Sequence, residues 1–347
     1  MKGIVKTKAT AGAVYCTDLP IPEIQDNQVL VKVHAAAICG TDMHIYDWTE
    51  YAQDRLHLPM VFGHEFAGEI VKTGSMVEGF AVGDRVAGET HIPCNTCEQC
   101  RTGKQHICKN MRIIGVQEAG AFATYIPVHK DCLWKLADEI DYETGAILEP
   151  MGVAVHGVLS GEIGGKTVVI LGCGPIGLFA IAAAKASGAE QIFAVDLFPQ
   201  KLECALQVGA DIVINSKLEC VAQIVFDATS GKGADVVIDY TGNQFAIESG
   251  FAALKKGGRF TFVGLSNGKI SLNINDAIIY KEAQINGVTG RLMYQTWYDC
   301  ERLLRTGKVA VQKIIGGRYP MSAFDDAFAA LKNGAPGKML LIPDEEF

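Results

Sequence analysis

The spacing of hydrophobic residues along the chain changes near residue 167, so the chain has two parts with different hydrophobic patterns. After this point, apolar runs of four or five residues alternate with longer amphipathic runs. This alternation is typical of a parallel sheet with helices on both faces. We therefore predict strands at 168–171, 192–195, 212–214, 235–239, 259–263 and 282–288. Helices are predicted at 176–187, 200–208 and 244–254.

The first part of the chain has shorter alternations that favour strands. Strands are predicted at 69–72 and 82–87, where Gly68 and Gly74 permit bulges and tight turns. Near the end, a helix at 294–306 and a strand at 338–342 are expected to return to the first domain. These patterns predict an α/β protein with a strand-rich domain at 1–152, a doubly wound domain at 153–291 and a C-terminal segment at 292–347.

Length and composition agree with two ordinary globular domains. The chain has 347 residues, of which 49% are hydrophobic and 20% charged. Its 31 Lys and Arg against 39 Asp and Glu give a net charge of −8, which argues against nucleic acid or a membrane surface as partner. The N-terminal sequence lacks the apolar core of a signal peptide, so we expect a cytoplasmic protein whose eleven cysteines are metal ligands or buried thiols.

Four cysteines within 15 residues indicate a structural zinc site. Cys94, Cys97, Cys100 and Cys108 have two-residue gaps between the first three, which let one turn direct adjacent sulfurs at one ion. A redox pair or disulfides are the rival interpretations, but neither needs all four thiols. Basic residues are expected to offset the thiolate charge; they are Arg101, Lys104, Lys109 and Arg112.

A second metal site is predicted from Cys39, His64 and Glu65. A thiolate, an imidazole and a carboxylate suit a catalytic zinc that keeps one position open for water or substrate. Around them, Gly63-His64-Glu65-x2-Gly68-x5-Gly74-x2-Val77 resembles at every position the signature of the zinc-dependent medium-chain alcohol dehydrogenases. Asp42 is expected to orient the zinc-bound imidazole of His64.

This resemblance implies a GroES-like catalytic domain that holds one catalytic and one structural zinc. It also implies that Thr41 takes the substrate proton and passes it through the cofactor ribose to His44, and that His91 lies near the substrate. Glu149, at the end of the first domain, is a second candidate acid for the catalytic zinc. We expect Glu65 and Glu149 to exchange or alternate as ligands during turnover.

A glycine-rich turn follows the first predicted strand of the second domain. In Gly172-Cys173-Gly174-Pro175-Ile176-Gly177, the glycines allow the turn, the approach of a pyrophosphate and close helix packing. Asp196 follows the next strand, where its carboxylate accepts hydrogen bonds from an adenosine ribose and repels a ribose phosphate. The sequence therefore predicts a six-stranded Rossmann domain that binds NAD rather than NADP. Lys201 either borders the adenosine or is an exposed lysine of the next helix.

Four segments resemble the threonine dehydrogenases within this superfamily: residues 39–48, 59–65, 287–291 and 296–298. The similarity extends from about residue 28 to 340. It implies a small-molecule alcohol substrate with L-threonine favoured, a homotetramer, and a nicotinamide site lined by Val263, Gly264, Leu265, Val288 and Thr289. Val153, which stands where the resemblance leads us to expect Asn, leaves a polyol or diol substrate as an alternative. A zinc-stabilised NAD-binding scaffold without turnover is the alternative of another class, although the candidate ligands and relay residues are all present.

Overall fold

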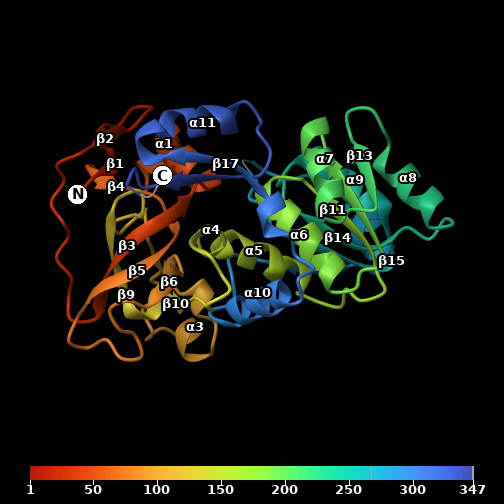
Figure 1. Ribbon diagram of the computed structural model, residues 1–347. Coiled ribbons are helices and arrows are strands. Elements are labelled where there is room, and N and C mark those ends of the chain that lie inside the picture. Colours follow the sequence, from red (N-terminus) through yellow and green to blue (C-terminus); the bar gives the residue numbers. More distant parts are fainter. Residues whose placement is uncertain (267, 346–347) are drawn as a thin grey trace. The chain divides into compact units, whose positions relative to one another are not determined.

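The computed structural model describes residues 1–266 and 268–345, which form two compact units (Figure 1). Unit 1 contains Met1–Glu149, Ile315–Asn333 and the residues from Lys338 onward, and unit 2 contains Pro150–Ile314 and Gly334–Gly337. From the sequence, we predict that the chain returns to the first domain at residue 292. Residues up to 314 instead belong to unit 2, where η4 (Val311–Lys313) packs on α7 (Pro199–Val208).

Unit 1 is built on a seven-stranded, mostly antiparallel sheet. Its strand order is β10 (Leu133–Lys135), β6 (Arg85–Gly88), β5 (Glu65–Thr73), β3 (Gln28–Ala37), β18 (Lys338–Ile342) and β17 (Ile315–Pro320), and β9 (Tyr125–His129) also pairs with β3. The predicted strand at 82–87 is wrong at its start, because Val82 is exposed beside a turn in which Gly83 has φ +92°. The long pairing of β3 with β5 sets the position of the predicted ligands Cys39, His64 and Glu65.

Smaller elements surround this sheet. A three-stranded sheet has the order β2 (Val14–Cys16), β1 (Gly3–Lys6) and β4 (Met60–Val61), and β7 (His91–Ile92) pairs with β8 (Arg112–Ile113). The helices of this unit are α1 (Gly40–Asp47), α2 (Glu50–Gln53), α3 (Glu98–Arg101), α4 (Tyr142–Ala146) and α11 (Phe324–Lys332). Helix α5 (Leu148–Val158) begins here and continues into unit 2.

Unit 2 contains the predicted six-stranded parallel sheet. The strand order is β13 (Ile212–Asn215), β12 (Gln191–Asp196), β11 (Thr167–Leu171), β14 (Ala234–Asp239), β15 (Leu254–Phe262) and β16 (Gln284–Gly287). Numbered along the chain, this is the 3-2-1-4-5-6 order of a Rossmann fold, in which a dinucleotide binds where the order reverses, at the carboxyl ends of the strands. The predicted doubly wound fold is confirmed.

Helices bury both faces of this parallel sheet. Alternate side chains of β11, such as Val169 and Leu171, share a core with Val225 of α8 (Val221–Ala228) and Phe251 of α9 (Gln244–Ala253). All five residues of β11 are buried, so the opposite face is covered too. The remaining helices of the unit are α6 (Pro175–Ala186), α7 and α10 (Gln295–Arg305).

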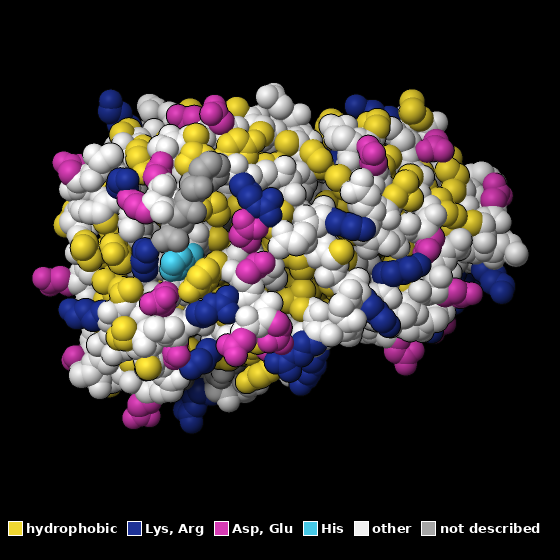
Figure 2. Space-filling model, viewed as in Figure 1, with side chains coloured by type: hydrophobic (Ala, Val, Ile, Leu, Met, Phe, Trp, Pro, Cys, Tyr) yellow, Lys and Arg dark blue, Asp and Glu magenta, His cyan; other side chains and the backbone are white. Residues whose placement is uncertain are grey.

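Figure 2 shows basic and acidic side chains interspersed over the face in view, together with scattered apolar groups. Among the described residues, no helix is long and apolar enough to cross a membrane.

Candidate active site

Cys39, His64 and Glu65 come together in unit 1 at one end of the β3–β5 pair. Cys39 is the N-cap of α1 just after β3, and Ala37 pairs with Glu65 across the sheet. The candidate ligand atoms of the three residues lie within 4.8 Å of one another. Gly63 turns the chain before His64 with φ +91°, and a Cβ there would overlap the ring of Phe122. The thiolate, imidazole and carboxylate fit a zinc ion.

Asp42 lies behind His64, as expected for a group that orients a metal ligand. Its Oδ1 is 3.6 Å from His64 Nδ1, and its Oδ2 accepts the amide of Cys39 at 2.8 Å. Burial lowers the pKa of His64, but the charges of Asp42 and Cys39 outweigh burial and raise this pKa to about 10. Because the imidazole stands in a strongly negative field, a cation is stabilised at this position.

Lys338 is a member of this site that the sequence did not predict. It begins β18, which pairs with β3, and its buried Nζ donates to Glu65 Oε1 at 2.5 Å and to the carbonyl of Ile38 at 2.9 Å. Burial raises the pKa of Glu65, while the charge of Lys338 lowers it, and the net direction is upward. The carboxylate therefore has a cationic partner within the protein.

Glu149, the second candidate acid, lies outside the cluster of Cys39, His64 and Glu65. It is buried in the first turn of α5 and interacts electrostatically with His64 and Glu65. The charges of the two carboxylates thus act on each other, and Lys338 pairs with Glu65.

The two predicted relay residues lie on α1, separated by one helical turn. Thr41 interacts with the hydroxyl of Tyr51, and the Tyr51 ring lies 5.8 Å from that of His44. His44 is exposed, and its Nδ1 is 3.1 Å from the hydroxyl of Thr49. Burial raises the pKa of Tyr51, so this residue adds a protonated hydroxyl beside Thr41. Nothing in the sequence pattern marked Tyr51, which follows α1 by only four residues.

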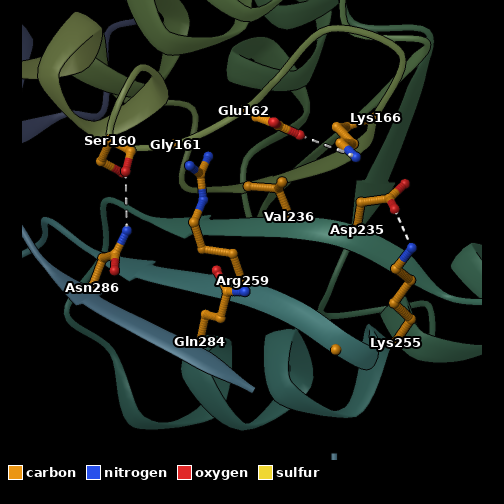
Figure 3. Close-up of a pocket in the computed structure, with 11 residues that line it drawn as sticks. Ser160, Gly161, Glu162, Lys166, Asp235, Val236, Lys255, Arg259, Gln284 and Asn286 are labelled. Atoms are coloured by element: carbon orange, nitrogen blue, oxygen red, sulfur yellow. Dashed lines mark hydrogen bonds and ion pairs between the residues drawn. The ribbon is translucent and has the colours of Figure 1, made fainter. Parts of the chain in front are cut away.

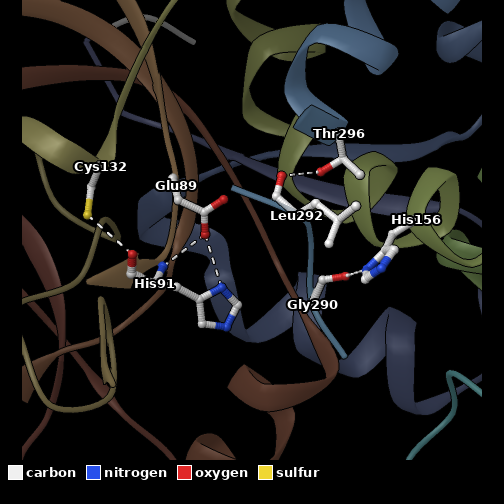
Figure 4. Close-up of polar contacts among 7 residues, drawn as sticks. All are labelled: Glu89, His91, Cys132, His156, Gly290, Leu292 and Thr296. Carbon is white, nitrogen blue, oxygen red and sulfur yellow. Dashed lines mark hydrogen bonds and ion pairs between the residues drawn. The ribbon is translucent and has the colours of Figure 1, made fainter. Parts of the chain in front are cut away.

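His91 is held by a buried acid two residues earlier in the chain. Glu89 is fully buried, and its Oε1 accepts the backbone amide of His91 and lies 3.0 Å from Nδ1 of the ring (Figure 4). The sulfur of Cys132 is 3.5 Å from the carbonyl of His91. These contacts fix the position of His91 and favour the tautomer with a proton on Nδ1.

The four clustered cysteines of unit 1 have sulfurs within 4.8 Å of one another, as a tetrathiolate zinc requires. Amide groups donate to these sulfurs: Cys97 N to Cys94 at 3.4 Å and Cys94 N to Cys108 at 3.3 Å. Hydrogen bonds to Thr96 and to backbone amides lower the pKa of Cys94 to about 5. Arg112, which we expected to offset the thiolate charge, forms an ion pair with Glu118 instead.

The glycine-rich turn in unit 2 joins the carboxyl end of β11 to α6. Gly172 has φ +93°, and Gly174 is the N-cap with Pro175 and Ile176 in the first helical turn. A Cβ on Gly177 would lie 1.9 Å from the carbonyl oxygen of Gly172. The turn leaves the helix N-terminus accessible to a phosphate, which fits the pyrophosphate of a dinucleotide.

Asp196 ends β12 beside this turn. Its Oδ2 accepts the amide of Cys173 at 2.8 Å, and its Oδ1 accepts the amides of Leu197 and Phe198. Each carboxylate oxygen has further lone pairs for a ribose hydroxyl. Lys201 lies over the Phe198 ring at 4.8 Å, and Lys217, which the sequence did not single out, lies over it at 5.7 Å.

The predicted nicotinamide residues follow the last two strands of the parallel sheet, at the same carboxyl edge. Val263, Gly264 and Leu265 follow β15, and Val288 and Thr289 follow β16. A Cβ on Gly264 would lie 2.4 Å from the amide nitrogen of Gly242, so this close approach requires glycine. Leu265 is 86% exposed, which leaves an apolar side chain in solvent at this edge.

Comparisons with known proteins match both parts of the chain to dehydrogenases. A family model described as "Alcohol dehydrogenase GroES-like domain" matches residues 25–138, and one described as "Zinc-binding dehydrogenase" matches residues 175–306. The L-threonine 3-dehydrogenase of Bacillus subtilis (strain 168) is 41% identical, with 99% of both chains covered. That of Pyrococcus abyssi (strain GE5 / Orsay) is 43% identical over 99% of this chain and 98% of the relative. The crystal structure of 2R,3R-butanediol dehydrogenase from Bacillus subtilis is similar with a TM-score of 0.90 and 29% identity, covering 99% of both chains.

Proposed function

The chain belongs to the zinc-dependent alcohol dehydrogenase family, and from this we propose that it oxidises the β-hydroxyl of L-threonine to 2-amino-3-oxobutanoate with NAD as hydride acceptor. The observation that carries the proposal is the cluster of Cys39, His64 and Glu65 in the same chain as a glycine-rich dinucleotide turn. The full-length similarity to threonine dehydrogenases supports the choice of substrate.

The catalytic zinc would be held by Cys39, His64 and one acid, Glu65 or Glu149. A zinc ion lowers the pKa of a bound hydroxyl group and so favours the alkoxide that expels hydride. Glu65 lies in the cluster with Cys39 and His64 but is also paired with Lys338, so Glu65 and Glu149 would exchange as the third ligand during turnover. A second zinc would be held by Cys94, Cys97, Cys100 and Cys108.

Thr41 would accept the proton of the substrate hydroxyl, and His44 would deliver it to solvent. The contact with Tyr51 orients the hydroxyl of Thr41. The exposure of His44 suits a residue that exchanges protons with water. His91, oriented by Glu89, would contact the substrate.

NAD is preferred over NADP in this proposal because Asp196 stands where a ribose 2′-phosphate would bring further negative charge. The ammonium groups of Lys201 and Lys217 are both placed over the ring of Phe198, two residues after Asp196. Asp196→Ala is expected to weaken the binding of NAD more than that of NADP. Steady-state kinetics with each cofactor give the ratio of the two kcat/KM values.

A 2,3-diol or polyol is the second candidate substrate. The similarity to 2R,3R-butanediol dehydrogenase and the apolar Val153 on α5 favour it. Comparison of kcat/KM for L-threonine, L-serine, 2,3-butanediol and sorbitol, followed by NADH formation, decides between the candidates. We expect L-threonine to give the highest value, and a higher value for butanediol or sorbitol contradicts the proposal.

Two controls separate an enzyme from a zinc-stabilised NAD-binding scaffold. Metal analysis should give two zinc ions per chain, whereas a scaffold without the catalytic ion would give one. Thr41→Val keeps the shape of the side chain but removes its hydroxyl, and we expect kcat to fall by about 100-fold. NADH binding to this variant should be unchanged.

We also propose that the protein is a cytoplasmic homotetramer. The exposed apolar side chains of Ile274, Ile279 and Tyr280 offer surface for contact between copies, and so does the outer edge of β16, which is the last strand of the sheet among the described residues. Light scattering coupled to size-exclusion chromatography measures the number of chains.

A further inference from the structure

A charged pocket lies at the amino-terminal edge of the parallel sheet in unit 2. Its volume is about 540 Å³, and its charged lining residues are Glu162, Lys166, Asp235, Lys255 and Arg259 (Figure 3). Lys166, Asp235 and Lys255 lie at the starts of strands β11, β14 and β15, and Arg259 pairs with Gln284 at the start of β16. The glycine-rich turn instead follows the carboxyl end of β11. Because the strands are parallel, the pocket lies at the edge opposite the dinucleotide turn.

A bulge between β14 and β15 shapes this pocket. Ala234 pairs with Leu254 and Val236 pairs with Arg259, so Asp235 alone stands opposite the four residues 255–258. Gly257 in this bulge has φ +71°. Its amide donates to the carbonyl of Lys281 at 2.6 Å, so the bulge is held to the segment that precedes β16.

Both carboxylates of the pocket already have lysine partners. Asp235 forms an ion pair with Lys255, and it also accepts the amide of Thr167 at 2.9 Å. Glu162 lies 3.7 Å from Lys166. Three cations and two carboxylates leave one positive charge in excess, and the remaining cation is Arg259.

Arg259 is buried and only partly satisfied. It is 6% exposed, and its Nη2 donates to the carbonyl of Val158, the last residue of α5, at 3.3 Å. Within residues 1–266 and 268–345, Nε and Nη1 have no hydrogen-bond partner and the guanidinium has no ion-pair partner. Burial lowers the pKa of Arg259. A buried charge without a partner is costly, and a nearby anion would offset this cost.

The surroundings of Arg259 accommodate the guanidinium at the floor of the pocket. Its tip points to Gly161, where a Cβ would lie 1.8 Å from Nη1 (Figure 3). Lys166 and Lys255 are both partly exposed, so their ammonium groups can reach a ligand at the rim. The pocket thus combines the buried guanidinium of Arg259 with the two partly exposed ammonium groups of Lys166 and Lys255.

We propose that this pocket binds a small organic anion, a phosphate or a carboxylate, at a site separate from the dinucleotide and zinc sites. The net charge favours an anion, and ammonium and guanidinium groups pair well with the oxygens of both classes. The volume accepts a metabolite-sized molecule. The inference does not depend on which alcohol the enzyme oxidises.

The test is isothermal titration of the zinc-loaded, full-length protein with inorganic phosphate and, separately, with acetate at constant ionic strength. Saturating NADH is present throughout, because the glycine-rich turn at the N-terminus of α6 is itself a phosphate-binding feature. We expect saturable binding of one anion per chain, and preference for phosphate or acetate identifies the class. Absence of saturable binding for both anions overturns the proposal.

Charge variants locate the site. Lys255→Gln removes the excess charge, and affinity should fall by about tenfold. Asp235→Asn keeps an oxygen for the amide of Thr167 but adds one net positive charge, so affinity should rise by a similar factor. Lys256→Gln is the matched control, because Lys256 is exposed and does not line the pocket, and it should change affinity less than twofold. Equal effects of Lys255→Gln and Lys256→Gln would place the anion elsewhere and refute the assignment.

Discussion

Replacement of Lys6 by Met is expected to destabilise unit 1 and disturb the helix that carries the predicted proton relay. Lys6 is fully buried, and its Nζ donates to the carbonyls of Thr10, Gly12 and Tyr46 at 2.6, 2.7 and 2.8 Å. The ammonium also lies 5.5 Å from the centre of the Trp48 ring. These contacts fasten the segment after β1 to the last turn of α1.

The magnitude follows from these three charge-assisted bonds. Each contributes about 1.5–3 kcal/mol, and the cost of burying the ammonium offsets part of their sum. Burial lowers the pKa of Lys6, which reflects that cost. Met has nearly the same length but cannot donate a hydrogen bond, so the carbonyls of Thr10, Gly12 and Tyr46 lose a donor. We expect a loss of about 3–5 kcal/mol.

Urea unfolding of the zinc-loaded protein, followed by tryptophan fluorescence, measures this loss. In thermal unfolding, the same change should lower Tm by about 10 °C for a unit of this size. Lys8→Met is the matched control, because Lys8 is exposed two residues away on the same segment. A loss below about 1 kcal/mol, or equal losses in both variants, would refute the reasoning.

Three further predictions concern separate parts of the molecule. Gly177→Ala should weaken NADH binding at least tenfold in a fluorescence titration, because the new Cβ would collide with the carbonyl of Gly172; an unchanged Kd contradicts this. Burial lowers the pKa of His129, and its Nδ1 accepts a hydrogen bond from the amide of Asp131. The neutral imidazole of His129 therefore contributes its full stabilisation above the unfolded pKa of about 6.5, and this stabilisation is lost as the pH falls below that value. Urea midpoints between pH 7 and 5 should therefore fall less in His129→Asn than in the parent, and parallel profiles would exclude this role. Cys100→Ser should release the structural zinc, measured as one zinc fewer per chain, and retention of both ions would contradict a four-sulfur site.

The parallel sheet was predictable because its signal is local. The apolar residues of β11 and β12 are contiguous, and a strand buried on both faces reads as an uninterrupted apolar run. The strand predicted to begin at Val82 failed for the converse reason. Val82 has high strand propensity, but Gly83 turns the chain beside it with φ +92°, and turn geometry overrides the propensity of one residue.

The clustering of the four cysteines was predictable because their spacing in the sequence is itself the chemical signal. The two-residue gaps between Cys94, Cys97 and Cys100 are enough to indicate one ion. Lys338 carries no such signal, since a lysine at the start of a strand is ordinarily exposed. Its contact with Glu65 results from the pairing of β18 with β3, which joins residues about 300 positions apart. Tyr51 was missed for a related reason, because its contact with Thr41 depends on how α2 follows α1.

The position of Lys338 has a consequence for the synthesis of the chain. The four cysteines of the proposed structural zinc site lie within 15 residues, so they can bind metal as soon as this short segment leaves the ribosome. Glu65 obtains its buried cationic partner only after β18 is made, because Lys338 lies 273 residues further along the chain. The two metal centres would therefore mature in a fixed order, and a protein truncated before residue 338 would retain the cysteine site but carry an unbalanced acid at the catalytic one.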